Sequence, residues 1–368
     1  MPRTKPPFRA DHVGSLLRPA ALKEARAKHQ RGEIDAGALR AIEDREIAAV
    51  VKSQEDIGLE GVTDGEFRRS WWHFDFFRGL DGVTPFTTDH GIKFAGVETK
   101  AEGIKISGKI GFSGHPMLDH FRYLKSHARV TPKMCIPAPS TMHFRQGRAL
   151  VSRELYPDLD GFFDDLAATY RTAIRAFYDA GCRYLQLDDT AWAMICDPKE
   201  REGSRARGDD PDALPARYAR LTNAALRDKP ADMAITMHSC RGNFRSTFIA
   251  SGGYEFVAEH LLGAVKGIDG YFLEYDSDRA GGFEPLRFFP KGQKQLVLGL
   301  VTSKNGTLES KDTVKRRIDE ATKYVTIDQL CLSPQCGFAS TEEGNILAED
   351  EQWAKLRMIV EIADEVWG

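Results

Sequence analysis

Four side chains of the types that bind zinc follow short apolar runs in the second half of the sequence. His238 and Cys240 lie in "AITMHSC", Glu274 ends "GYFLE", and Cys336 lies in "SPQCGF". Two thiolates, one imidazole and one carboxylate form a tetrahedral donor set whose softness suits zinc better than magnesium or calcium. Because the four residues come from three separate strand ends, we expect a catalytic Zn²⁺ site and not a local structural site.

The spacing of His238 and Cys240 supports a shared metal. On an extended chain, side chains two residues apart project to the same side, so this pair can bind one ion without distorting the backbone. A buried His or Cys taken alone is more often a packing residue. The prediction therefore depends on Glu274 and on Cys336, whose neighbour Gly337 permits a tight turn.

Other polar residues stand at predicted strand ends. Asp188 in "YLQLDD" is costly inside a barrel unless it binds something, so it is a candidate partner for a substrate cation such as an α-amino group. The alternative is a carboxylate satisfied by a helix N-terminus or an arginine. Glu66 in "VTDGEF" has a similar position, and the turn at Gly14 and Ser15 offers backbone N–H groups for a carboxylate. Taken separately, Glu66 and the turn are better explained as structural.

Two further segments leave alternatives open. Residues 70–79, "SWWHFDFFRG", place five aromatic rings around His73, which suits either a substrate wall or packing in the core or in a homo-oligomer. Packing is the commoner use. The charged stretch 198–212 is predicted to be a loop, either a solvated surface loop, which is the commoner case, or a mobile cover of the active site.

Helical and extended patterns alternate along the chain, which is typical of βαβ units and a parallel sheet. The pattern predicts an α/β fold, a (β/α)8 TIM barrel in which residues 1–368 form a single domain with a β-rich excursion around residues 84–132. The active face of such a barrel lies at the C-terminal ends of its strands. Helices are predicted at the following ranges: 37–58, 159–181, 218–228, 253–265, 310–325 and 349–367.

Bulk composition narrows the classes of partner and location. A chain of 368 residues with a formal charge of −3 gives no reason to expect nucleic acid or an anionic membrane as a partner. We find no apolar run of the roughly 20 residues that a membrane span needs, and no apolar leader at the N-terminus. The six cysteines do not cluster, so we expect reduced thiols and a cytoplasmic location.

Six motifs together resemble the cobalamin-independent methionine synthase family, in particular its C-terminal catalytic barrel in a short, single-domain form. "HVGSLLRP" is similar to the family's I-G-S-F-P, "TDGEF" to H-G-E, and "LQLDDTAW" to I-Q-I-D-E-P-A. "MHSC" is similar to H-M-C-Y, "FLEYDSDR" to I-S-I-E-x-S-R, and "SPQCGF" to N-P-D-C-G-L. The resemblance implies that zinc binds the four residues identified above, and that Ser15, Glu66 and Asp188 recognise an amino-acid substrate.

The resemblance also implies an activity. The chain is expected to be a methyltransferase like 5-methyltetrahydropteroyltriglutamate–homocysteine S-methyltransferase, which methylates a zinc-activated thiol such as homocysteine to give methionine. A zinc-bound thiol loses its proton, because the thiolate is both the metal ligand and the nucleophile. A non-catalytic binding protein on the same barrel is a weaker alternative, because it has no need of a four-ligand set beside an acidic pair.

One departure leaves the methyl donor open. The family has Y-D-I-H-S-P-R in the loop where this chain has "VTSKNGT", so Lys304 stands near the histidine that gives a proton to the folate. The family's folate-stacking tryptophan has no secure counterpart in "STMHFRQG". The donor is therefore a folate or a corrinoid, and a zinc-dependent thiol alkyltransferase of the epoxyalkane:coenzyme M transferase type is the alternative function.

Overall fold

The computed structural model describes residues 3–368 and contains a curled parallel sheet of seven strands. The strands occur in the order β1-β6-β7-β8-β9-β10-β11, and each paired neighbour runs parallel. Their bounds are β1 (Gly61–Val62), β6 (Thr131–Pro137), β7 (Tyr184–Asp189), β8 (Ala234–Ser239), β9 (Gly270–Glu274), β10 (Gln295–Val301) and β11 (Leu330–Pro334).

The N-terminal segment closes this sheet into a barrel. Ala10 forms a parallel bridge with Leu332 of β11, and the Asp11 N–H donates to the Leu332 carbonyl at 3.0 Å. On its other side, the Thr63 hydroxyl next to β1 donates to the Gly14 carbonyl at 2.6 Å. Residues 10–14 thus lie between β11 and β1, at the position of the eighth strand of the barrel. The predicted (β/α)8 fold is confirmed.

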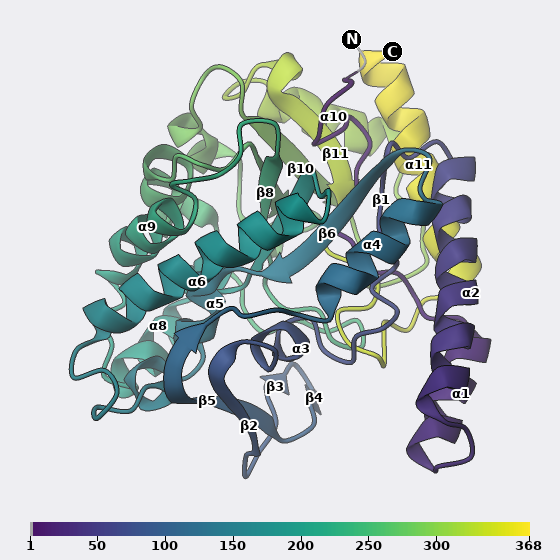
Figure 1. Ribbon diagram of the computed structural model, residues 1–368. Helices are drawn as coiled ribbons and strands as arrows, with labels where there is room; N and C mark the ends of the chain where they lie inside the picture. The colour runs from purple at the N-terminus through teal and green to yellow at the C-terminus, as the bar shows by residue number, and fades with distance from the viewer. Residues whose placement is uncertain (1–2) are drawn as a thin grey trace.

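Helices cover the outside of the barrel (Figure 1). The longer ones are α1 (Ala20–Gln30), α2 (Ala36–Asp56), α4 (Met117–His127), α6 (Leu159–Asp179), α9 (Leu214–Ala225), α10 (Lys311–Ala321) and α11 (Glu349–Trp367). The shorter ones are α3 (Phe74–Phe77), α5 (Pro139–Phe144), α7 (Ala191–Met194) and α8 (Pro198–Ala206).

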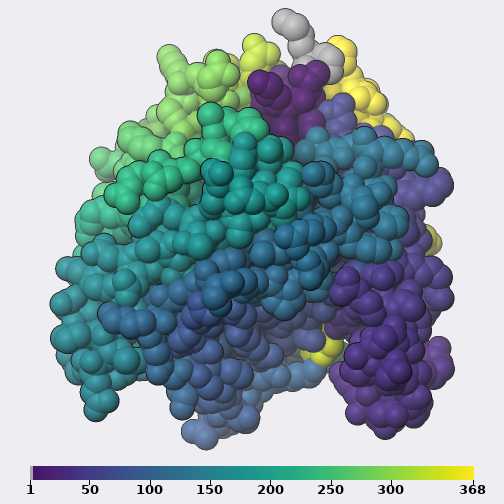
Figure 2. All heavy atoms as spheres, in the orientation of Figure 1, coloured from purple at the N-terminus to yellow at the C-terminus, as the bar shows by residue number. Residues whose placement is uncertain are grey.

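Helix α6 illustrates why these segments are helical. Asp158 caps its N-terminus by accepting from the Gly161 N–H at 2.9 Å, and Leu166, Tyr170 and Phe177 lie buried at helical spacing. Figure 2 shows the N-terminal segment in purple beside the yellow C-terminal helix at one end of the molecule. No helix within residues 3–368 is both long enough and apolar enough to cross a membrane.

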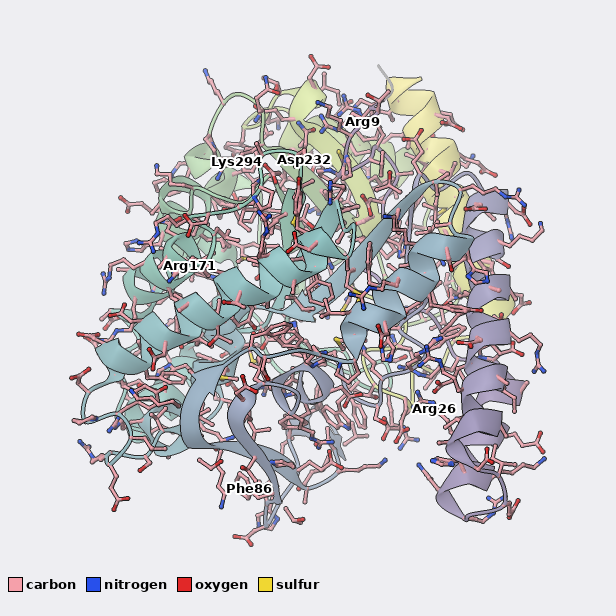
Figure 3. The ribbon with its side chains drawn as sticks, in the orientation of Figure 1. Arg9, Arg26, Phe86, Arg171, Asp232 and Lys294 are labelled. Atoms are coloured by element: carbon pink, nitrogen blue, oxygen red, sulfur yellow. The ribbon has the colours of Figure 1, made fainter. Side chains whose placement is uncertain are left out.

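The predicted β-rich excursion is an antiparallel hairpin of β2 (Asp81–Thr87) and β5 (Glu102–Gly111), with the short pair β3 (Lys93–Phe94) and β4 (Val97–Glu98) between them. The rest of the predicted stretch contains helix α4 and the start of β6. Met117, Phe121 and Leu124 are buried at helical spacing and explain this helix. Figure 3 shows Phe86 at the hairpin end of the molecule and Arg9 at the opposite end.

Two other predicted elements differ from the structure. The stretch 198–212 is not a loop throughout, because Pro198–Ala206 form α8. Asp197 caps this helix by accepting from the Lys199 N–H at 2.9 Å. Within α8, Ser204 is buried and the charged side chains are wholly or partly exposed. The stretch 253–265 is a 3₁₀ turn at Tyr254–Phe256 followed by a π-helical turn at Glu259–Ala264.

Candidate metal centre and substrate cavity

The four predicted zinc ligands converge at the C-terminal ends of the barrel strands. His238 lies near the end of β8 and Cys240 follows it, Glu274 ends β9, and Cys336 follows β11. All four are buried, and their ligand atoms lie within 4.8 Å of one another. The Cys240 and Cys336 Sγ atoms are 3.4 Å apart. Bonds of about 2.0–2.3 Å to a tetrahedral zinc place donor atoms roughly 3.3–3.8 Å apart, so the separation of the two sulfur atoms matches that of two ligands of one ion.

The hydrogen bonding of the cluster also suits a metal. His238 Nδ1 lies 3.3 Å from the Phe272 carbonyl, which orients the ring. Among the described residues, neither His238 Nε2 nor Glu274 Oε2 has a hydrogen-bond partner, although both atoms are buried. A polar atom buried without a hydrogen bond is costly, and a metal ion bound here would satisfy both atoms.

Charge is balanced around the cluster by a buried arginine that the sequence did not indicate. The Arg241 guanidinium lies 3.7 Å from Glu274 Oε2 and donates to the Tyr254 hydroxyl at 2.9 Å and to the Gly252 carbonyl at 2.8 Å. Within the cysteine pair, a hydrogen bond from the Cys240 thiol holds the pKa of Cys336 well below its ordinary value. The same contact raises the pKa of Cys240. One thiolate is thus already favoured in this site.

The two predicted substrate carboxylates form a second cluster. Oxygen atoms of Glu66 and Asp188 and the Cys135 sulfur lie within 4.8 Å of one another. Glu66 is ion-paired with Arg69, and Asp188 accepts from Gln186 Nε2 at 2.7 Å. Burial raises the pKa of both carboxyl groups, that of Glu66 to about 7, against the lowering effect of Arg69. Asp188 is the register partner of His238 across β7 and β8, which sets this cluster beside the first.

Two glycines leave room for the side chains of Ser15 and Glu66, which lie directly against the glycine backbone. A Cβ atom at Gly337 would lie 2.0 Å from the Ser15 Oγ, and one at Gly14 would lie 2.6 Å from Glu66 Oε1. Gly14 also has φ of 138°, which side chains rarely adopt. The Ser15 Oγ accepts from the Ala339 N–H at 3.3 Å. The structure therefore brings all three predicted substrate residues to the same end of the barrel as the ligand cluster.

One cavity of about 580 Å³ joins these groups. Its lining includes three of the four ligands, namely His238, Cys240 and Cys336, together with Ser15, Glu66 and Asp188. Trp71, Trp72 and His73 also line it, so part of the aromatic segment forms a cavity wall. Phe76 and Phe77 pack in the hydrophobic core. Packing is therefore confirmed for these two residues, whereas a substrate wall that includes Trp71 and Trp72 stays a prediction.

Lys304 lies outside the lining of this cavity. Its Nζ donates to the Gly242 carbonyl at 3.2 Å, to Asn243 Oδ1 at 3.1 Å and to the Thr247 carbonyl at 3.2 Å. The amine therefore ties down the loop that follows Cys240, and its protons are engaged there.

Sequence patterns did not identify Arg69, Arg145 or Asn243 as cavity residues. Arg69 lies three positions after Glu66, a spacing that brings the two side chains together, so it was detectable from its neighbour. Arg145 and Asn243 follow a helix and a strand end with no recurring pattern, and only the fold turns them toward the cavity.

Comparison with known proteins agrees with this geometry. The sequence profile described as "Cobalamin-independent synthase, Catalytic domain" matches residues 8–365. The chain belongs to this family. It is 56% identical over 364 residues to the uncharacterized protein YxjH of Bacillus subtilis, covering 99% of this chain and 96% of that protein. It is 22% identical over 334 residues to a methionine synthase of Sulfolobus acidocaldarius, covering 88% of this chain and 84% of that protein.

Solved structures agree with the fold. A chain from Listeria monocytogenes, provisionally named a vitamin-B12 independent methionine synthase, is 43% identical with a TM-score of 0.81 and full coverage of both chains. A B12-independent methionine synthase from Shewanella, in complex with selenomethionine, has a TM-score of 0.73 at 17% identity, with 97% of each chain covered. The predicted family and the prediction of a methyltransferase are confirmed.

Proposed function

We propose that residues 1–368 form a single catalytic barrel, and that it is a zinc-dependent S-methyltransferase. The acceptor is a thiol amino acid, homocysteine, and the product is methionine. The observation that carries this proposal is the convergence of His238, Cys240, Glu274 and Cys336, with ligand atoms within 4.8 Å of one another. This donor set suits Zn²⁺, and the six cysteines, all free and buried, suit a reducing cytoplasm.

A bound zinc ion supplies a Lewis acid that favours the thiolate form of the substrate sulfur at neutral pH. The protein's own groups place the rest of the acceptor. Asp188 and Glu66 are acceptors for the substrate ammonium, and Arg69 keeps part of the Glu66 population ionised by pairing with it. Ser15 lies on the same cavity wall to bind the carboxylate. The aromatic wall of Trp71 and Trp72 excludes water from the sulfur.

The acidic pair separates the first function from its alternative. Two carboxylates beside the metal cluster attract an ammonium group and repel an anionic sulfonate such as that of coenzyme M. Relatives named for the same chemistry support this assignment, among them a 5-methyltetrahydropteroyltriglutamate–homocysteine methyltransferase of Synechococcus that is 23% identical over 339 residues. The match covers 90% of this chain and 40% of that longer protein.

The test is an activity screen of the zinc-loaded protein with two thiols and three electrophiles. Homocysteine and coenzyme M are each combined with methyl-folate, methyl-cobalamin and an epoxide. We expect methionine from homocysteine, and no product from a Cys240→Ser control. Turnover of coenzyme M with an epoxide, without turnover of homocysteine, would establish the alternative. Absence of thiol alkylation in every combination would contradict both.

A further inference from the structure

Arg18 is a buried arginine that the proposed function does not yet use. It lies between the Ser15 turn and α1, and its side chain is only 3% exposed. Burial lowers the pKa of Arg18 to about 9, so the group remains a cation at neutral pH. Within the described residues its guanidinium makes four hydrogen bonds, all to backbone carbonyl groups. A buried cation is costly unless it is hydrogen-bonded, so these four contacts hold Arg18 in place.

The four carbonyl groups belong to two loops at the C-terminal ends of the strands. The amine loop, residues 64–69, carries Glu66, and the metal loop, residues 336–341, begins with Cys336. Arg18 Nη2 donates to the amine loop and Nη1 to the metal loop. The four distances to the carbonyl oxygens are 3.0 Å for Glu66, 2.9 Å for Arg69, 3.2 Å for Ala339 and 3.0 Å for Thr341. The planar guanidinium therefore bridges the two halves of the site.

The bridge acts on a strained residue. Glu66 has φ of 60°, in the left-handed region that residues other than glycine rarely adopt. The Glu66 N–H donates to Asp64 Oδ1 at 2.8 Å and the Glu66 carbonyl accepts from Arg18, so both backbone groups are held. Such a conformation persists only where its surroundings fix it. Loss of the Arg18 contact is therefore expected to let the Glu66 backbone relax and its carboxylate leave its place beside Asp188.

The backbone next to Arg18 makes the same connection. The Leu16 N–H donates to the Gly65 carbonyl of the amine loop at 3.1 Å, and the Ser15 carbonyl accepts from the Phe338 N–H of the metal loop at 2.9 Å. Residues 15–18 thus lie between the two loops. Within residues 3–368, Arg18 is the one side chain that hydrogen-bonds to both of them.

We propose that Arg18 is a positioning residue that couples the two loops: a metal ion bound by Cys336 orders the amine loop through Arg18 and so holds the Glu66 carboxylate in place for the substrate ammonium. The identity of the metal and of the amine rests on the proposed function. Coupling between two binding sites is reciprocal, so an amino-acid thiol bound at Glu66 in turn strengthens the retention of the metal.

Hydrogen exchange followed by mass spectrometry tests the coupling in the full-length protein, with and without zinc. We expect zinc to slow the exchange of the metal-loop amides. Zinc should also slow the exchange of the amine-loop amides by about tenfold, although that loop contains none of the four proposed ligands. In Arg18→Lys, zinc should slow only the metal loop, because an ammonium keeps the charge but lacks the planar fork that reaches both loops.

Two further variants guard the interpretation. Arg18→Gln removes the buried charge as well as the fork and should give the same result as Arg18→Lys. Arg26→Lys is the matched control. Arg26 extends from α1 (Figure 3), and its hydrogen bonds to backbone groups go to Phe67 and Arg69 of the amine loop and not to the metal loop. Arg26→Lys should therefore keep the effect of zinc on the amine loop.

The possible results separate this proposal from the proposed function. Protection of the amine loop by zinc that is equal in wild type and Arg18→Lys would overturn the coupling role, because the backbone hydrogen bond from the Trp72 N–H to the Ser340 carbonyl would then suffice. Equal losses in Arg18→Lys and Arg26→Lys would overturn it as well. Protection confined to the metal loop in the wild type would overturn the coupling and leave the metal site standing. Protection in neither loop would contradict the metal site and the coupling together.

Discussion

Replacing Asp188 with asparagine tests whether the acidic pair binds the substrate amine. Asp188 is buried, and its Oδ1 accepts from Gln186 Nε2 at 2.7 Å. Asparagine keeps the shape and removes the charge. A charge-assisted hydrogen bond to an ammonium is worth about 1.5–3 kcal/mol, which corresponds to roughly 10- to 150-fold in kcat/KM. We therefore expect a loss of this size with homocysteine.

The assay compares homocysteine with 4-mercaptobutanoate, which keeps the thiol and the carboxylate but lacks the amine. Asp188→Asn should leave kcat/KM for 4-mercaptobutanoate nearly unchanged. Asp189→Asn is a neighbouring control, because Asp189 hydrogen-bonds the Ser140 hydroxyl and accepts from the Trp192 N–H at 2.9 Å. That variant should affect both thiols equally. Equal losses for both thiols in Asp188→Asn would show that Asp188 is structural and would refute the reasoning.

Four further outcomes follow from the structure. Cys240→Ser should lose the metal and the activity. Its circular dichroism spectrum should stay unchanged, because the barrel core does not depend on the cluster. Unchanged zinc content in this variant would contradict the assignment. Burial raises the pKa of Glu66 from 4.5 to about 7, so the folded state binds the Glu66 proton more tightly than the unfolded state does. The free energy of unfolding of the wild type should therefore fall by up to about 3 kcal/mol as pH rises from 5 to 8. Glu66→Gln should remove this loss in urea unfolding of the metal-free protein, and identical pH slopes would refute the burial argument. Lys304→Met should destabilise the fold by about 1–3 kcal/mol through three unpaired acceptors, without changing the ratio of methyl-folate to methyl-cobalamin turnover. Because Lys304 is held outside the cavity, we expect methyl-cobalamin, whose leaving group needs no proton, to react faster than methyl-folate, and the reverse order would show that another residue supplies the proton.

Much of the barrel was predictable because its signals are local. The helix at 159–181 and the strand that follows it were identified from periodicity and from a glycine stop, and the structure places α6 and β7 there. Helix α4 was not identified, because its buried residues stand among charged ones directly after a β-rich stretch. Residues 10–14, at the position of the eighth strand, have no strand-like sequence pattern, because only their contacts with β11 and β1 define this position.

The candidate site was predictable to a different degree for each type of residue. Cys336 and Glu274 were identified because strand ends in a parallel barrel meet at one face, and the structure brings them together. Arg145 was not identified, because its position depends on how α5 packs beneath the hairpin, which no local pattern encodes. Lys304 was placed by similarity to a loop of the family, whereas its contacts with Gly242 and Thr247 are tertiary.

The central claim is that a zinc ion held by His238, Cys240, Glu274 and Cys336 binds the sulfur of the acceptor. Zinc K-edge X-ray absorption on the zinc-loaded protein, with and without homocysteine, tests this most directly. We expect one zinc per chain with two sulfur ligands at about 2.3 Å, rising to three sulfur ligands when homocysteine is added. A sulfur count that stays at two in the presence of homocysteine, or a zinc site without sulfur, would contradict the account.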